Sequence, residues 1–149
     1  MVPTDGIEAI GDGILFDDGV FLKWGSDVER DKLYKKKEFR ADRAIYHWGE
    51  RSILNGLTLY FRTICWNQKQ HGNFKSFEGV EFVLEGHDAD EKFLDIKTRL
   101  ESIFGEAKYK EDVQPGDVSL EWRVKAVKIS LDILNKEWRK VRLEIGLWL

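Results

Sequence analysis

The stretch "EWRVKAVKISLDILNKEWRKVRLEIGLWL" (121–149) decides the fold, because two runs within it alternate apolar and polar residues. Alternation with a period of two places apolar side chains on one face of a β-strand and polar ones on the other. The apolar positions are odd-numbered in both runs: Val127, Ile129, Leu131 and Ile133, then Val141, Leu143, Ile145 and Leu147. We therefore predict a C-terminal β-hairpin with one buried face.

The register of this hairpin follows from keeping both apolar sets on one face, which requires paired residue numbers with an even sum. A three-residue loop of Asn135, Lys136 and Glu137 satisfies this condition. The predicted apolar pairs are Leu131 with Val141, Ile129 with Leu143, and Val127 with Ile145. On the other face we expect Asp132 beside Lys140, Ser130 beside Arg142, Lys128 beside Glu144 and Leu134 beside Trp138, with each such pair contributing about 0.2–1 kcal/mol.

The run before this hairpin carries its apolar residues at even positions instead: Val118, Leu120, Trp122 and Val124. A β-bulge or a strand break near Lys125–Ala126 would return both runs to one buried face. Trp122 then points into the core, whereas Trp138 and Trp148 share the polar face. The repeated Glu-Trp-Arg at 121–123 and 137–139 is therefore a coincidence.

Five further strands are predicted upstream. "GILFDDGVFLKWG" (13–25) reads as two short strands around a turn at 17–19, and the strands at 43–50 and 57–67 flank the turn-forming Asn55-Gly56. A polar loop at 67–78, long enough to be functional or mobile, leads to a strand at 79–86. In the strand at 57–67 the inward face is predicted to hold Leu57, Leu59, Phe61, Thr63 and Cys65.

Two helices are predicted from capping patterns. Ser26 and Glu29 form a capping box for a helix at 27–37, and Asp88 with Glu91 marks the start of a second helix that ends at Gly105. The apolar face of the second helix consists of Phe93, Ile96, Leu100, Ile103 and Phe104. The element order predicts a single α+β domain over 1–149, a mainly antiparallel sheet with about two helices packed on one face.

Composition narrows the class of protein. A chain of 149 residues with 42% apolar residues, 34% charged residues and a net charge of -3 is typical of one soluble domain. A single cysteine suits a reducing compartment, and neither a signal peptide nor an apolar run of about 18 residues is visible, so we expect a cytoplasmic protein without membrane contact. The acidic balance argues against binding to nucleic acid.

Catalytic and metal-binding motifs are missing from the sequence. His47, His71 and His87 show no metal-ligand spacing, and the acidic residues next to His87 are explained by helix capping, so we predict no metal and no cofactor. Cys65 is predicted to be an inert core thiol rather than a nucleophile. No phosphate-loop, dinucleotide-binding, nucleophile-elbow or kinase pattern is present, so we predict no catalytic residue.

Six tryptophans exceed what a chain of this size needs, and tryptophan and arginine are enriched at the centres of protein interfaces. The polar face of the C-terminal hairpin gathers Trp138, Trp148, Arg142 and Lys140. We predict that these four residues bind a protein partner.

In its size, slight acidity, α+β layout and lack of a catalytic motif, the whole chain resembles the immunity proteins that neutralise toxins of bacterial interbacterial-competition systems. The resemblance implies a non-enzymatic protein that caps a toxin's active site or blocks its partner surface. Four acidic residues, Glu85, Asp88, Asp90 and Glu91, would steer the encounter with a basic nuclease cleft. The alternatives are a small-ligand-binding module with a pocket between sheet and helix, and an enzyme of unrecognised type. The sequence leaves the oligomeric state open.

Overall fold

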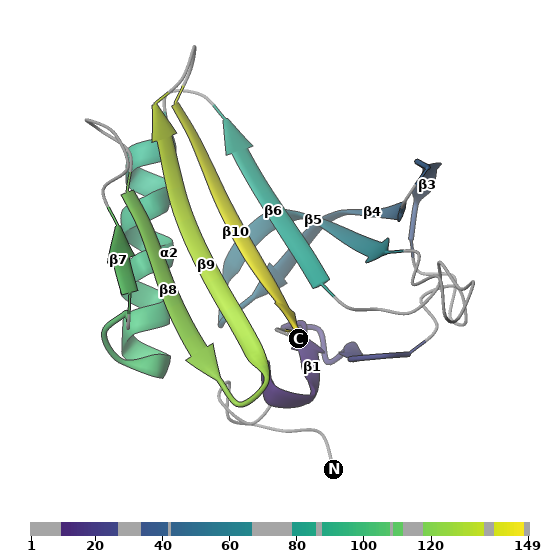
Figure 1. Ribbon diagram of the computed structural model, residues 1–149, viewed down its shortest axis with the longest axis horizontal. Coiled ribbons are helices and arrows are strands. Elements are labelled where there is room, and N and C mark those ends of the chain that lie inside the picture. Colours follow the sequence, from purple (N-terminus) through teal and green to yellow (C-terminus); the bar gives the residue numbers. More distant parts are fainter. Residues whose placement is uncertain are drawn as a thin grey trace.

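Ten strands and helix α2 are defined in the computed structural model, which describes residues 10–26, 34–41, 43–66, 79–85, 88–107, 109–111, 118–135 and 139–147 (Figure 1). The strands are β1 (Gly13–Leu15), β2 (Phe21–Lys23), β3 (Lys36–Phe39), β4 (Arg43–Ile53), β5 (Leu57–Trp66), β6 (Gly79–Glu85), β7 (Tyr109–Glu111), β8 (Val118–Val124), β9 (Val127–Asn135) and β10 (Arg139–Leu147). Helix α2 spans Ala89–Phe104.

Eight of these strands form one antiparallel sheet in the order β3-β4-β5-β6-β10-β9-β8-β7, and β1 and β2 pair separately as a hairpin. Helix α2 packs against β6, β9 and β10 and lies behind the sheet in Figure 1. The predicted α+β class, with a mainly antiparallel sheet and a helix on one face, is confirmed.

The C-terminal hairpin is confirmed, but its predicted register was wrong by two residues. Both strands keep the predicted faces, because a shift of two preserves the alternation. The observed apolar pairs are Val141 with Ile133, Leu143 with Leu131, Ile145 with Ile129, and Leu147 with Val127. This register pairs all four apolar residues of each strand, whereas the predicted one pairs only three. It also moves Asp132 from Lys140 to Arg142, Ser130 to Glu144, Lys128 to Gly146 and Leu134 to Lys140.

The predicted break at Lys125–Ala126 is a two-residue turn that joins β8 and β9 into a second hairpin. Lys125 has a φ of 55°, and Val124 pairs with Val127 across the turn. The turn places the even-numbered apolar residues of β8 on the same face as the odd-numbered ones of β9. Trp122 is buried as predicted, and its Nε1–H donates a 2.8 Å hydrogen bond to the Gly105 carbonyl at the end of α2.

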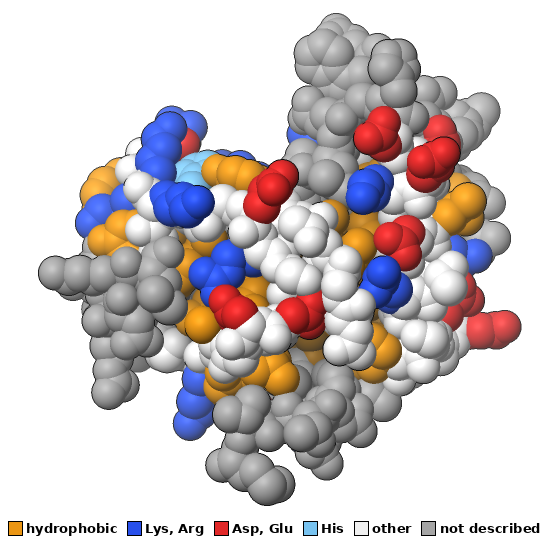
Figure 2. All heavy atoms as spheres, turned by 180° about the vertical axis from the view of Figure 1, so that it is seen from behind, with side chains coloured by type: hydrophobic (Ala, Val, Ile, Leu, Met, Phe, Trp, Pro, Cys, Tyr) orange, Lys and Arg blue, Asp and Glu red, His pale blue; other side chains and the backbone are white. Residues whose placement is uncertain are grey.

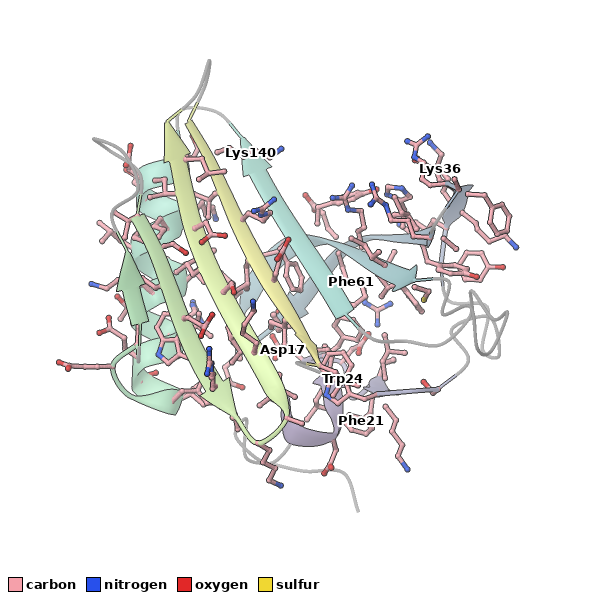
Figure 3. The ribbon with its side chains drawn as sticks, in the orientation of Figure 1. Asp17, Phe21, Trp24, Lys36, Phe61 and Lys140 are labelled. Carbon is pink, nitrogen blue, oxygen red and sulfur yellow. The ribbon has the colours of Figure 1, made fainter. Side chains whose placement is uncertain are left out.

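The inner face of β5 is confirmed, since Leu57, Leu59, Phe61, Thr63 and Cys65 are all at most 1% exposed. The β1–β2 hairpin covers this face: the rings of Phe16 and Phe61 meet edge to face with centroids 4.7 Å apart. Figure 3 shows Phe21 and Trp24 of the same hairpin region below Phe61. The core therefore has two neighbouring parts, one under the β1–β2 hairpin and one under α2.

Helix α2 begins and ends where the sequence predicted. Asp88 occupies the predicted N-cap position, but its side chain makes no capping hydrogen bond. Gly105 has a φ of 83° and closes the helix with a 2.9 Å bond from its N–H to the Glu101 carbonyl. Three residues of the predicted apolar face are buried, Phe93, Ile96 and Leu100, and Ile103 and Phe104 are partly buried.

Two short strands were not predicted. Lys36 and Lys37 belong to β3 rather than to the end of a helix at 27–37, whose residues 27–33 lie outside the described part of the chain, as does the loop at 67–78. Strand β7 lies in a segment read as a loop. Both strands have only one neighbour in the sheet and polar sequences, KKEF and YKE, with no apolar alternation to reveal them.

Candidate functional site

The predicted partner-binding residues Lys140 and Arg142 lie on the outer face of β10, turned away from α2. The Arg142 Nη2 is 3.7 Å from an Asp132 carboxylate oxygen, and its Nε is 3.4 Å from Glu144. Asp132 is only 8% exposed and accepts a 2.5 Å hydrogen bond from the Ser119 hydroxyl. Trp138 and Trp148 lie outside the described residues, so this surface stays a prediction.

Charges on the neighbouring part of the same face are also internally compensated. The Glu121 carboxylate contacts the Arg123 Nε at 2.8 Å and the Lys128 Nζ at 3.9 Å. The ion pairs of β8, β9 and β10 run both along and between the strands and leave this face nearly balanced in charge. Such exposed pairs contribute little to stability individually.

The acidic residues predicted to steer a partner lie at the start of α2. Asp88, Asp90 and Glu91 are exposed, and their charges suit the positive pole of the helix dipole. The backbone of Glu85 pairs with Lys140 at the end of β6. Within the described ranges no group of three His, Cys, Asp or Glu side chains could hold a metal ion. Steering by these carboxylates stays a prediction.

The Cys65 side chain is buried in the core, as predicted. His71 and His87 lie outside the described residues. His47, which the sequence did not single out, lies between two polar side chains from neighbouring strands. Its Nδ1 is 2.7 Å from the Tyr60 hydroxyl of β5, and its Nε2 is 2.9 Å from a carboxylate oxygen of Glu38 on β3.

The His47 Nε2 is buried and has no hydrogen-bond partner among the described residues, so its contact with Glu38 is a close approach rather than a hydrogen bond. The three side chains link β3, β4 and β5 across the outer face of the sheet. None of them lines the pocket described below. We assign them a role in holding β3 onto the sheet.

Several cations surround the Glu38 carboxylate. Lys36 Nζ is 3.4 Å from it, and Arg40 Nη2 is 3.2 Å from its other oxygen. The hydrogen bond from Lys36, followed by the charges of Lys36, His47 and Arg40, lowers the pKa of Glu38 below 4.5 despite some desolvation. Glu38 is therefore ionised at neutral pH.

These side chains form what we call the basic face, the outer face of β3, β4 and β5. It consists of Lys36, Glu38, Arg40, Arg43, His47, Tyr60 and Arg62. Four of these residues are Lys or Arg, and one is acidic. Figure 2 shows Lys and Arg side chains gathered beside a histidine on this part of the molecule, and in Figure 3 Lys36 lies among nitrogen-tipped side chains beside β3.

Gly49 inside the β4 strand pattern is a sequence signal for the basic face. Ile53 pairs with Leu57 and Glu50 with Tyr60, which follows from the turn at Asn55-Gly56. The register then shifts by one between His47 and Gly49, so that His47 pairs with Arg62. A glycine inside a strand pattern is a signal for such a β-bulge. With that bulge, hairpin arithmetic alone brings His47 beside Tyr60 and Arg62.

Asp17 connects the β1–β2 turn to the β4–β5 turn. Its carboxylate accepts hydrogen bonds from the Ser52 hydroxyl, from the Asn55 amide at 3.0 Å and from the Gly56 amide at 2.7 Å. Desolvation raises the pKa of Asp17, but these hydrogen bonds and the charge of Arg99 outweigh it and lower the pKa below 3.8. Figure 3 shows Asp17 behind the sheet.

Arg99 attaches the same turn to helix α2. Its Nη1 donates hydrogen bonds to the Leu54 carbonyl at 3.1 Å and to the Asn55 carbonyl at 2.8 Å, while its Nε pairs with Asp95 at 3.0 Å. Asp17 thus accepts hydrogen bonds from the amides of the turn between β4 and β5, and Arg99 donates hydrogen bonds to the carbonyls of the same turn. We call Asp17, Ser52 and Arg99 the turn clasp.

A pocket of about 350 Å³ opens beside β4, next to the turn clasp. It lies between β4 and the β1–β2 turn, not between sheet and helix as the ligand-binding alternative had it. Its lining consists of Asp18, Lys35, Trp48, Glu50, Arg51 and Ser52. Trp48 is buried and donates a 3.2 Å hydrogen bond from Nε1 to the Thr63 hydroxyl, which fixes its ring.

No family model, curated protein or solved structure matches this chain. Among the described residues, no helix has both the length and the apolar content that crossing a membrane requires.

Proposed function

We propose that this chain is a non-enzymatic protein-binding domain that docks through its basic face onto an acidic surface of a protein partner. The observation that carries the proposal is the separation of charge. Residues 34–66 contain seven Lys and Arg against three Asp and Glu, a net charge of +4, whereas the whole chain has a net charge of -3. The rest of the chain therefore has a net charge of -7.

The basic face carries more positive than negative side chains, since four of its residues are Lys or Arg and one is acidic. Glu38 is shared by Lys36, Arg40 and His47, so one carboxylate serves three basic side chains. A surplus of positive charge on one face attracts an acidic partner, accelerates the encounter and fixes its orientation.

An exposed aromatic side chain provides apolar contact area beside these charges. Tyr60 is 41% exposed within the basic face. Tyrosine and arginine are the residue types that carry much of the binding energy at protein interfaces.

The resemblance to immunity proteins suggests what kind of partner this is. In that case the partner is a toxin, and the domain neutralises it by covering an acidic surface that the toxin needs for activity. In this proposal a basic face binds an acidic surface, whereas Asp88, Asp90 and Glu91 would steer the domain towards a basic cleft. The two hypotheses differ in the residues whose substitution should abolish binding.

The test is an affinity pull-down with the tagged protein from a nuclease-treated lysate of the native host, quantified by mass spectrometry. The decisive variant is Lys36→Gln with Arg40→Gln, which neutralises two exposed cations without introducing a new charge. Its matched control is Lys97→Gln with Lys128→Gln, which changes the charge equally on α2 and β9. Two further variants, Trp138→Ala with Trp148→Ala and Asp90→Asn with Glu91→Gln, test the other surfaces.

We expect one stoichiometric protein that the wild type and the control variant retain, that the Lys36 and Arg40 variant loses, and that dissociates as the salt concentration rises. A partner lost only from the tryptophan variant would move the interface to the C-terminal hairpin. Loss only from the Asp90 and Glu91 variant would reverse the proposed polarity, and a partner removed by nuclease treatment would contradict binding to protein.

A further inference from the structure

The pocket beside β4 contains two charged groups of opposite sign that are not engaged with each other or with the rest of the described structure. Arg51 and Asp18 form an ion pair at 3.0 Å, and the Arg51 guanidinium also lies 4.4 Å from the centre of the Phe16 ring. Lys35 and Glu50 line the same pocket and are exposed, and neither forms an ion pair with another described residue.

Lys35 is held over the edge of β4 by a backbone irregularity. Its amide donates a 2.7 Å hydrogen bond to the His47 carbonyl, next to the β-bulge between His47 and Gly49. Gly49 has a φ of 78°, and a Cβ atom at this position would lie 3.1 Å from the Lys35 Nζ. The glycine thus provides both the bulge conformation and the space in which the lysine side chain crosses the strand.

Within the described residues, no strand pairs with the edge of β4 at this pocket. Strand β3 pairs with β4 only as far as His47. Beyond it, the Asp17 amide donates a 2.9 Å hydrogen bond to the Ser52 carbonyl. In an antiparallel strand the N–H and C=O of one residue point to the same side, and alternate residues point alike. The N–H and C=O of Glu50 therefore point to the same edge as those of Ser52.

From these observations we infer that the pocket binds a small zwitterion of the amino-acid type. The carboxylate of the ligand contacts the Lys35 ammonium and the Glu50 amide, and its ammonium contacts the Glu50 carboxylate. Trp48 and the stem of Arg51 form the wall for an apolar side chain. A volume of about 350 Å³ is at the lower end of the range for small-ligand sites and suits a single amino acid.

This site goes beyond the proposed protein interface, because no residue of the basic face lines the pocket. The two surfaces can be tested separately. A variant of Lys36 and Arg40 leaves the pocket residues unchanged, and a variant of Lys35 and Glu50 leaves the residues of the basic face unchanged.

The experiment is a titration of the ¹⁵N-labelled protein with L-leucine, followed by the backbone amide shifts of 50–52 and by calorimetry. Two analogues each lack one charged group of leucine. The first, 4-methylpentanoate, has the carboxylate without the amine, and the second, 3-methylbutylamine, has the amine without the carboxylate. We expect leucine to shift the amides of 50–52, and each analogue to bind at least about tenfold more weakly, because each loses one charged contact.

Protein variants provide a second test of leucine binding. Lys35→Met and Glu50→Gln should each weaken leucine binding at least about tenfold, whereas Lys97→Met on α2 should leave it unchanged. Melting curves show whether each variant is folded, and the analogue arm needs only the wild type. The inference is overturned if leucine leaves the amides of 50–52 unshifted, if either analogue binds as tightly as leucine, or if folded variants bind like the wild type.

Discussion

Removal of the Asp17 carboxylate should destabilise the domain more than its exposed position suggests. This side chain caps the turn between β4 and β5, in which Leu54 and Asn55 have left-handed φ angles of 53° and 60°. An aspartate that caps a helix contributes about 0.5–2 kcal/mol through one or two hydrogen bonds to amides. Asp17 accepts bonds from two amides and one hydroxyl, so Asp17→Ala should cost about 2 kcal/mol. For a chain of this length that loss lowers Tm by about 4–8 °C.

The pH dependence of this effect has a defined sign. Because the folded-state pKa of Asp17 lies below its ordinary value of 3.8, its contribution is present above the unfolded-state pKa and is lost as pH falls through the folded-state pKa. Thermal melts of wild type and Asp17→Ala at pH 7 and pH 3 should therefore differ more at pH 7. The control is Asp18→Ala, which removes one exposed ion pair with Arg51 and one 3.0 Å bond from the Val20 amide. The reasoning is refuted if Asp17→Ala costs no more than Asp18→Ala, or if its cost is the same at both pH values.

Three further variants test the fold. Trp122→Phe should lower the free energy of unfolding, measured by chemical denaturation, by about 2–3 kcal/mol, because it leaves the Gly105 carbonyl without its donor and opens space in the core. A loss below about 0.5 kcal/mol would contradict that hydrogen bond. Leu131→Arg should abolish cooperative melting by circular dichroism because it places a charge at a fully buried position, whereas Lys140→Ala should change stability by less than about 0.5 kcal/mol; the opposite outcome would invert the faces of the sheet. A cysteine pair at Ser130 and Glu144 should form a disulfide under mild oxidation, whereas a pair at Ser130 and Arg142 should not, and the reverse pattern in mass spectrometry would restore the register predicted from sequence.

The sequence predicts the faces of the sheet better than its register. Alternation identified β8, β9 and β10 and the buried side of β5, because apolar residues at every second position in the sequence lie on one face of a strand. The register of the C-terminal hairpin depends on loop length, and 135–137 and 136–138 both give an even sum. Counting the apolar pairs that each choice allows would have selected the observed register, in which Leu147 meets Val127.

The surfaces were harder to predict than the fold, because they depend on contacts between distant segments. Nothing local links Asp17 to Gly56 or Arg99 to Leu54, and these contacts exist only because the β4–β5 turn reaches α2 and the β1–β2 hairpin. The basic face depends on a short polar strand, β3, that carries no periodic signal of its own. The charge surplus of 34–66 is visible in the sequence, but the placement of Lys36, Arg43 and Arg62 on one outer face requires the register of β4 with β3 and β5.

The most direct test of the proposed interface is zero-length cross-linking of the purified partner complex with a carbodiimide, which joins lysine amines to carboxylates in contact. The cross-linked peptides are then identified by mass spectrometry. The basic face predicts bonds from Lys36 to Asp or Glu of the partner, and none from Lys97 or Lys128. Cross-links from Asp88, Asp90 or Glu91 to lysines of the partner, with Lys36 unmodified, would contradict it.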